Sequence, residues 1–139
     1  MKLIVFVKAS QDSEAGKMPE QELLMKMGKF NEEMAKAGIL LDGAGLKPSK
    51  AGSRIRWSGG KTTVVDGPFA ETKELVSGYW ILQCKTKEEC IEWLKRAPFG
   101  EGAEVEVRPY FEMEDFNMSP ENKEQQDRII AAVAERQKQ

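Results

Sequence analysis

The stretch of sequence that decides the fold is GYWILQCKTKEECIEWL, residues 78–94. Its first half places Tyr79 and Ile81 on one face and Trp80 and Leu82 on the other, because successive side chains of a strand point in opposite directions. All of these side chains are apolar, so the pattern predicts a strand that needs cover on both of its faces.

The second half of this stretch predicts a helix. Thr86 and Glu89 have the spacing of a capping box, and Pro98 cannot continue a helix, so the helix lies between these points. It would bury three side chains, namely Cys90, Ile91 and Leu94. A strand that leads into such a helix indicates a sheet with helical cover.

Toward the C-terminus, residues 104–111 alternate between apolar and polar side chains, as a half-buried strand does. Arg108 falls on the polar face of this strand. Ser119 and Pro120 then start a final helix, which runs to about Gln137.

Toward the N-terminus, residues 1–9 repeat the pattern of a strand with two apolar faces, and the polar stretch Ser10–Met18 follows them. A helix is predicted over Pro19–Ala37, because Pro19 suits the first helical position and Gly38 is a natural stop. Its apolar stripe has spacings of four, three and four residues: Leu23, Met27, Phe30 and Met34.

A β-hairpin is predicted at Ser53–Ser58 and Lys61–Asp66, because the Gly-Gly pair at 59–60 tolerates the positive φ angles of a two-residue turn. Pairing outward from this turn places Asp66 opposite Ser53. In this register Asp66 shares a face with three apolar side chains, Ile55, Trp57 and Val64. The preceding strand, Ile39–Leu46, contains two glycines, Gly43 and Gly45, which predict a bulge or a bend.

The order of these elements predicts a ferredoxin-like α+β domain at residues 1–116, followed by a helical extension at residues 117–139. Two helices cover one face of its sheet. The other face stays open although its strands carry large apolar side chains, and an open face of that kind marks an interface. Since two-fold dimers are the commonest soluble assembly, we expect a homodimer packed sheet to sheet.

Composition limits the classes of function. The 139 residues are 40% hydrophobic and 32% charged with a net charge of -2, so we expect no nucleic-acid partner. The apolar run at residues 3–7 is shorter than a signal-peptide core, so we expect a cytoplasmic protein without membrane attachment. Cys84 and Cys90 match no zinc pattern and the chain has no histidine, so two reduced structural thiols are expected.

Residues 65–74, VDGPFAETKE, followed by Gly78 and Tyr79, resemble the signature of the DGPF group of YCII-related proteins. Three shorter segments resemble the same group in content and order: FNEE at 30–33, GLKPS at 45–49 and VRP at 107–109. The resemblance covers about residues 1–116 and implies a dimeric α/β barrel built from ferredoxin-like subunits. It also implies kinship with proteins regarded as candidate enzymes because of a histidine–aspartate pair, which this chain cannot form without a histidine.

Asp66 is the candidate catalytic residue. On the apolar face of the hairpin its carboxylate would be partly desolvated and could act as a base. The alternative is structural, with the side chain accepting hydrogen bonds from N–H groups of the following turn.

Six further side chains are candidates for binding a ligand, namely Arg56, Phe69, Glu71, Lys73, Tyr79 and Arg108. Arg108 would hold an anion or pair with Glu106 or Asp66, because a buried guanidinium needs an acid. Glu71 and Lys73 could equally be solvated surface charges.

Two charged segments are candidates for binding other ligands. Residues 47–61 contain five cations and no acid, which could attract an anion or could protect the hairpin edge from aggregation. The acids Glu112, Glu114 and Asp115 lie in an exit segment that rarely provides the converging oxygens of a Mg²⁺ site. We therefore expect no metal and no cofactor.

Two functions remain open. In the first, the homodimer binds or transforms a small anionic organic molecule in a cleft between the sheet and the first helix, with Asp66 as acid or base and Arg56 or Arg108 on the anionic group. In the second, the chain is a regulatory or interaction module without chemistry, linked to transcription, because members of the resembling group occur beside sigma-factor-like proteins. The missing histidine favours the second slightly, and a ligand in the cleft would decide for the first.

Overall fold

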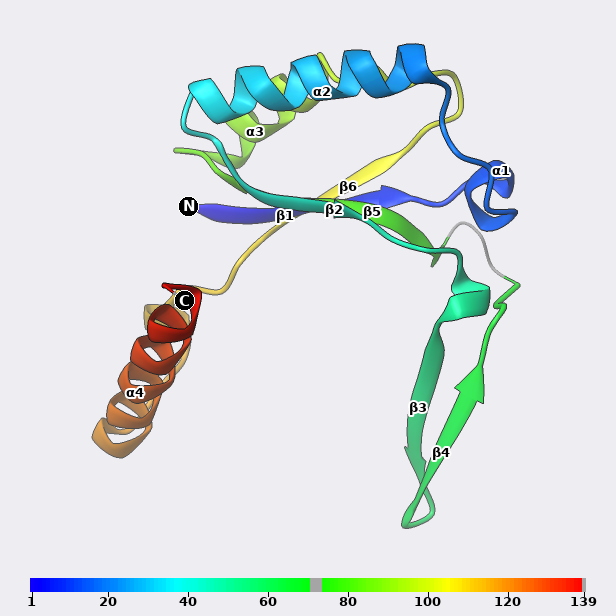
Figure 1. Cartoon of the computed structure of the whole chain (residues 1–139). Helices are drawn as coiled ribbons and strands as arrows, with labels where there is room; N and C mark the ends of the chain where they lie inside the picture. Colours follow the sequence, from blue (N-terminus) through cyan, green and yellow to red (C-terminus); the bar gives the residue numbers. More distant parts are fainter. Residues whose placement is uncertain (71–73, 139) are drawn as a thin grey trace.

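The computed structural model describes residues 1–70 and 74–138 (Figure 1). Its strands are β1 (Lys2–Lys8), β2 (Leu40–Gly45), β3 (Ser53–Ser58), β4 (Lys61–Asp66), β5 (Val76–Gln83) and β6 (Val105–Pro109). Its α-helices are α1 (Gln11–Glu14), α2 (Gln21–Lys36), α3 (Lys87–Leu94) and α4 (Pro120–Gln137). None of these helices is long and apolar enough to cross a membrane.

The main sheet has the strand order β2-β5-β1-β6, and all neighbouring strands are antiparallel. The central pair, β1 and β5, sets Leu3 opposite Leu82 and Val5 opposite Trp80. With α2 between β1 and β2, and α3 between β5 and β6, this is the ferredoxin-like α+β arrangement that the order of elements predicts. The β3–β4 hairpin is a separate two-stranded sheet inserted between β2 and β5.

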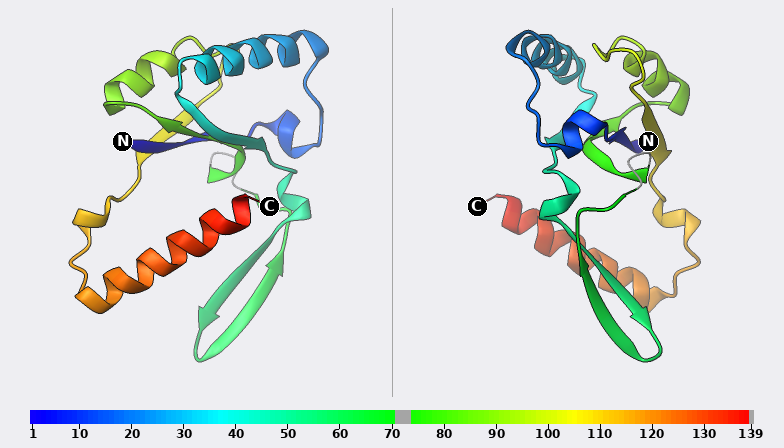
Figure 2. Two further views of the ribbon diagram at one scale, coloured as in Figure 1. Left: turned by 60° about the vertical axis from the view of Figure 1, so that its left-hand side comes forward. Right: turned by 90° about the vertical axis from the view of Figure 1, so that its right-hand side faces the viewer.

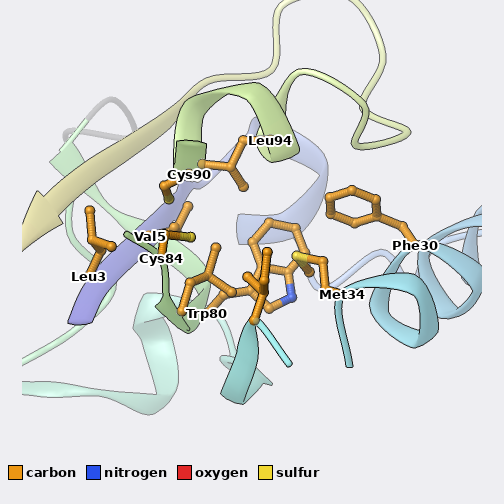
Figure 3. Packing of buried hydrophobic residues seen from close by; sticks show 10 residues of the cluster. Leu3, Val5, Phe30, Met34, Trp80, Cys84, Cys90 and Leu94 are labelled. Atoms are coloured by element: carbon orange, nitrogen blue, oxygen red, sulfur yellow. The ribbon is translucent and has the colours of Figure 1, made fainter. Parts of the chain in front are cut away.

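The hydrophobic core lies between the main sheet and the two helices that cover one of its faces, α2 and α3 (Figures 1 and 2). It combines side chains of the sheet and of both helices, among them Leu3, Val5, Trp80, Leu82, Phe30, Met34, Cys90 and Leu94 (Figure 3). The Phe30 ring packs edge-on against Trp80, with 5.8 Å between the ring centroids. Burying each large apolar side chain contributes roughly 1.5–3 kcal/mol, so this layer holds the helices on the sheet.

No described element covers the opposite face of the main sheet (Figure 1). On this face Ile4 pairs with Ile81 and Phe6 pairs with Tyr79, and all of these side chains are half-buried. The central strands are therefore apolar on both faces, as predicted. The hairpin and α4 both project on this open side of the sheet, one at each end of it in Figure 1.

The predicted start of the first long helix was wrong. The helix α2 begins at Gln21 with Glu20 as its N-cap, so Pro19 precedes the helix instead of occupying its first position. The polar stretch before Pro19 contains the short helix α1, which a reciprocal pair of serine hydrogen bonds caps. A helix of four residues is too short to produce a periodic pattern in the sequence.

The hairpin has the predicted register, with Ser53 opposite Asp66 and Ser58 opposite Lys61. Its apolar face is not buried, however. The exposed fractions on that face are 52% for Ile55, 76% for Trp57 and 62% for Val64. The hairpin therefore contributes little to the core of its own chain.

The helix α4 also stands apart from the core. It begins at Pro120 and ends at Gln137, as predicted, and the Ser119 hydroxyl oxygen accepts the N–H of Asn122 at 3.2 Å. None of its residues is buried, and three apolar side chains on it are about half exposed: Ile129, Ile130 and Val133. Packing within the single chain therefore stabilises α4 little.

Candidate functional site

Three glycines lie on the helix-facing side of the main sheet, and one of them, Gly45, borders open space. Gly43 of β2 pairs with Trp80, and Gly45 pairs with Gly78 of β5, so all three lie on the face to which the buried Trp80 belongs. A Cβ atom at Gly43 would lie only 2.8 Å from Cδ1 of Trp80, so the indole needs this glycine. A Cβ atom at Gly45 would have no heavy atom within 4 Å.

This open space is a cleft of about 390 Å³ between α2 and the sheet. Met27 of α2, Tyr79 and Trp80 of β5, and Phe99 of the loop after α3 line it together with the three glycines. A second cavity of about 590 Å³ shares three residues with the cleft, Val7, Ser77 and Phe99. Both volumes lie in the range of small-molecule sites, and the cleft lies where the small-molecule hypothesis expects one.

The polar side chains that line the cleft are bonded within the protein. The Trp80 indole Nε1–H donates to Oδ1 of Asn31 at 3.1 Å. The Ser77 hydroxyl lies 3.3 Å from the carbonyl oxygen of Val7 and 3.4 Å from that of Lys8. These bonds fix the walls of the cleft, and they occupy the Ser77 hydroxyl as a donor.

Asp66 lies outside the lining of this cleft. It ends β4, it is exposed, and its Oδ1 accepts a hydrogen bond from the Ser53 hydroxyl at 2.7 Å. The apolar face that it shares with Trp57 is exposed too. The carboxylate is therefore open to solvent in the single chain instead of desolvated, and its catalytic role stays a prediction.

Ser49 holds the turn that follows Asp66. The N–H of Phe69 donates to the Ser49 hydroxyl oxygen at 3.0 Å, and the N–H of Gly67 donates to the carbonyl oxygen of Gly52 at 3.0 Å. The expected hydrogen bonds from these turn N–H groups to Asp66 are therefore absent. A Cβ atom at Gly67 would clash with the Ser49 carbonyl, so this close approach requires glycine.

Glu14 of α1 completes this anchor. Its Oε2 accepts the Ser49 hydroxyl at 2.5 Å, and its Oε1 accepts the Ser49 N–H at 2.9 Å. Both bonds favour the charged carboxylate, so they lower the pKa of Glu14 below its usual value of 4.5. The network joins α1 to the loops before β3 and after β4, and thereby fixes the base of the hairpin to the body.

The predicted ligand-binding residues are spread over both sheets. Tyr79 is among the residues that line the cleft, but its side chain belongs to the open face of β5, where its hydroxyl lies 3.5 Å from Oδ2 of Asp42. Phe69 is half-buried in the turn after β4, where its ring lies 3.8 Å below the Arg54 guanidinium. Arg56 is exposed on β3.

Arg108 is exposed on β6, and its Nε lies 3.6 Å from Oε2 of Glu106. The other carboxylate oxygen of Glu106 lies 3.4 Å from Nζ of Lys8. Pairing with Glu106 is one of the predicted alternatives for Arg108. Glu71 and Lys73 lie outside the described residues.

Cys84 and Cys90 are buried between β5 and α3 (Figure 3). Burial raises the pKa of Cys90 to about 12 and also raises the pKa of Cys84. Thiols that stay protonated are poor nucleophiles and poor metal ligands. Within residues 1–70 and 74–138, no group of three histidine, cysteine, aspartate or glutamate side chains could hold a metal ion.

Sequence reasoning expected a cleft between the sheet and the first helix but did not identify the glycines beside it, and it missed the anchor. Gly43 and Gly45 predicted a bulge, which is present where the register shifts between Leu40 and Asp42. Their spacing of two residues was a second signal. Two glycines at this spacing lie on one face of a strand and leave that part of the face without side chains. The contact between Glu14 and Ser49 joins residues 35 positions apart, and no local pattern predicts it.

The chain matches the YCII-related domain over residues 1–114. An uncharacterised protein of Rhizobium meliloti (strain 1021) is 33% identical over 96 residues, which cover 67% of this chain and 77% of that protein. The domain match includes the whole main sheet, the hairpin and the cleft, and it ends before α4. The chain therefore belongs to the YCII-related domain family.

Proposed function

We propose that the protein binds a small organic molecule in the cleft between α2 and the main sheet. The observation that carries this proposal is the cleft of about 390 Å³ beside Gly45, where a Cβ atom would have no heavy atom within 4 Å. Protein interiors are close-packed, so the open space beside Gly45 gives up packing that a larger residue would supply. A concave, largely apolar site with a few polar groups is the usual form of a small-molecule site.

The lining indicates which kind of molecule fits. Met27, Trp80 and Phe99 offer apolar and aromatic surface, which suits a molecule with an apolar or planar body. The Asn31 amide is oriented by the Trp80 indole, which bonds to its oxygen, so its NH₂ group is left as a donor. An oxygen on the ligand, in a carbonyl or a carboxylate, would match this donor.

A negative charge on the ligand stays a prediction. Lys8 is the cation in the lining of the second cavity, which also includes the acids Glu101 and Glu104. Arg56 and Arg108 line neither cavity. We therefore propose that the ligand is a small molecule with an acceptor oxygen.

A thermal-shift panel of small aromatic and aliphatic acids, amides and amines tests the proposal, with Gly45→Val as the blocking variant. Because a Cβ at Gly45 meets no atom within 4 Å, valine should fill the cleft without unfolding the protein. We expect at least one class of compound to raise the Tm of the wild type and to leave that of Gly45→Val unchanged. Thr63→Val is the control. It introduces the same residue on the exposed hairpin, outside the cleft, and should respond like the wild type.

Equal shifts in the wild type and Gly45→Val would show that any ligand binds outside the cleft. No shift with any class would favour the module without chemistry over the binding protein.

We also propose that the protein is a homodimer in which a second copy covers the open face of the sheet. Ile4, Phe6, Tyr79 and Ile81 support this, because they form an apolar surface that the single chain only half buries. Sedimentation equilibrium at micromolar concentration tests it, and a monomer there would contradict it.

A further inference from the structure

The open face of the main sheet has opposite charges at its two edges. The strand pairing places four residues in one row across this face: Asp42 of β2, Ile81 of β5, Ile4 of β1 and Arg108 of β6. Because β2 and β6 are the edge strands, Asp42 and Arg108 end the row, and both are exposed. Three strand spacings, roughly 14 Å, separate their backbones, so the two charges do not meet within one chain.

The two halves of the sheet differ in charge as a whole. Asp42 is the only charged residue of β2 and β5. The other half, β1 and β6, contains three cations and one acid, namely Lys2, Lys8, Arg108 and Glu106. The open face is therefore complementary to itself, provided that the β2–β5 half of one copy lies on the β1–β6 half of another.

The row next to Asp42 and Arg108 fits the same exchange of halves. It has aromatic side chains at its centre: Ala44, Tyr79, Phe6 and Glu106. When the two halves are exchanged, an aromatic ring meets an aromatic ring, and the small side chain of Ala44 leaves room for the partner's Glu106. Charged ends around an apolar centre are the usual build of a protein–protein interface.

We propose that the two sheets of the homodimer pack with the two-fold axis parallel to their strands, so that Asp42 of each protomer forms an ion pair with the partner's Arg108. This inference rests on the proposed homodimer and adds its orientation and the contact that fixes it. Such an axis exchanges the two edges of the sheet and keeps each row over itself. Ile81 then packs on the partner's Ile4, and every contact is made twice.

The shape of the molecule permits this packing. In Figure 1 the hairpin and α4 lie at the two ends of the strands and leave the middle of the open face uncovered. Sheets that pack face to face lie about 10 Å apart, a gap that a long arginine and a short aspartate side chain bridge together. The Arg108 side chain is 67% exposed in the single chain, so it is accessible to a partner.

A two-fold axis across the strands explains less of the face. Centred on the same two rows, it would place Arg108 on the partner's Glu106, which is also an ion pair. However, it would place Asp42 on an alanine and Lys2 on the partner's Lys8, at a cost from like charges. The axis along the strands pairs both edge charges and brings no like charges together.

A charge swap tests the contact. Asp42→Arg places two cations at both edges of the dimer, and Arg108→Asp places two acids there, so we expect each change to raise the dimer dissociation constant about tenfold or more. The double variant Asp42→Arg with Arg108→Asp restores opposite charges at both edges and should recover most of the lost affinity. An equal mixture of the two single variants should recover it as well, because the heterodimer is matched at both edges.

The controls carry the same changes of charge on α2, on the other side of the sheet. Glu32→Arg and Lys29→Asp are exposed positions there and should leave the dissociation constant unchanged. A loss of affinity equal to that of the matching edge variant would mean that net charge, and not the proposed ion pair, governs association.

Cross-linking tests the orientation without charge reversal. Asp42→Cys and Arg108→Cys are made separately and treated with a bismaleimide that has a short spacer, while Cys84 and Cys90 stay buried. A mixture of the two variants should give a covalent dimer, and each variant alone should give little. Efficient linking of Asp42→Cys to itself would indicate the axis across the strands and overturn the proposal.

The outcomes separate this contact from the homodimer on which it rests. If the wild type is a monomer in sedimentation equilibrium, the homodimer is wrong and the ion pair is wrong with it. If the wild type is a dimer but the single variants match it, or neither the double variant nor the mixture recovers affinity, the homodimer stands and the proposed orientation is wrong.

Discussion

Gly67 is the residue on which the anchor of the hairpin depends most directly. Its Cα lies so close to the Ser49 carbonyl that a methyl group cannot be added without moving the backbone. We predict that Gly67→Ala lowers the free energy of unfolding by about 1–3 kcal/mol, the usual cost of overpacking. Urea denaturation followed by circular dichroism measures this change.

Gly28→Ala is the matched control, because a Cβ at Gly28 in α2 would have no heavy atom within 4 Å. Alanine is favoured over glycine inside a helix by about 1 kcal/mol, so this variant should be more stable than the wild type. Equal effects of the two substitutions would show that Gly67 has no special steric role.

Glu14 gives the hairpin anchor a dependence on pH. The hydrogen bonds from Ser49 lower the pKa of Glu14 in the folded state below 4.5, so folding is favoured by the charged carboxylate. The contribution is complete above the unfolded pKa and is lost as the pH falls through the lower, folded pKa. We predict that Glu14→Gln is less stable than the wild type at pH 6 and that this difference shrinks as the pH falls below 4.5.

Chemical denaturation of both proteins between pH 6 and pH 3 measures this difference. A gap that stays constant over the whole range would mean that the carboxylate charge does not stabilise the anchor. Ser49 can donate its N–H and hydroxyl to a glutamine oxygen as well, so the test isolates the charge from the shape of the side chain.

These residues also show where sequence reasoning was limited. The segment Val65–Glu74 indicated the family, and Asp66 was its most conspicuous ionisable residue. In the structure, however, Gly67 is the residue that no side chain can replace without a clash, and Ser49 makes the central hydrogen bonds. Both depend on contacts between distant parts of the chain, which periodicity and turn preferences cannot reveal.

At the scale of the elements, the capped helices α3 and α4 differ in how much of the core they contribute. The Thr86 hydroxyl oxygen accepts the N–H of Glu89 at 3.1 Å and caps α3, which contributes Cys90 and Leu94 to the core. Ser119 caps α4, none of whose residues is buried. A lost cap costs a helix about 1 kcal/mol.

We therefore predict that Thr86→Ala lowers the global free energy of unfolding by about 1 kcal/mol. Ser119→Ala should leave it nearly unchanged under dilute, monomeric conditions, because α4 can fray without exposing the core. Thermal melts of the two variants at low protein concentration make the comparison. Equal losses would show that α4 unfolds together with the domain.

The elements were predictable wherever the signals were local. The hairpin register was predicted correctly because the Gly-Gly turn at 59–60 fixes which residues oppose one another. The capping box before α3 formed only in part, since Glu89 Oε2 accepts the N–H of Lys85 at 2.9 Å instead of that of Thr86. A cleft between the sheet and the first helix was expected, but most of its lining was not predicted, because it depends on how β2 and β5 align two glycine-containing segments that are far apart in the sequence.

At the scale of the whole molecule, stability is unevenly distributed. The main sheet and its two helices share a common core, whereas the hairpin and α4 bury little in their own chain (Figures 1 and 3). Segments with few buried contacts open at a low cost in free energy. An interface with a second copy would remove this difference in stability between the core and the two outer segments. A partner that binds only the folded form stabilises that form by mass action.

Hydrogen exchange at two protein concentrations, one below and one above the dimer dissociation constant, measures this directly. Amides of β1 and β5 should be strongly protected at both concentrations, because these strands carry the core residues Leu3, Val5 and Leu82. Amides of β3, β4 and α4 should exchange quickly in the monomer, because these elements bury few side chains in their own chain. Protection of the hairpin and α4 that is already complete in the monomer would instead place their stabilising contacts within the single chain.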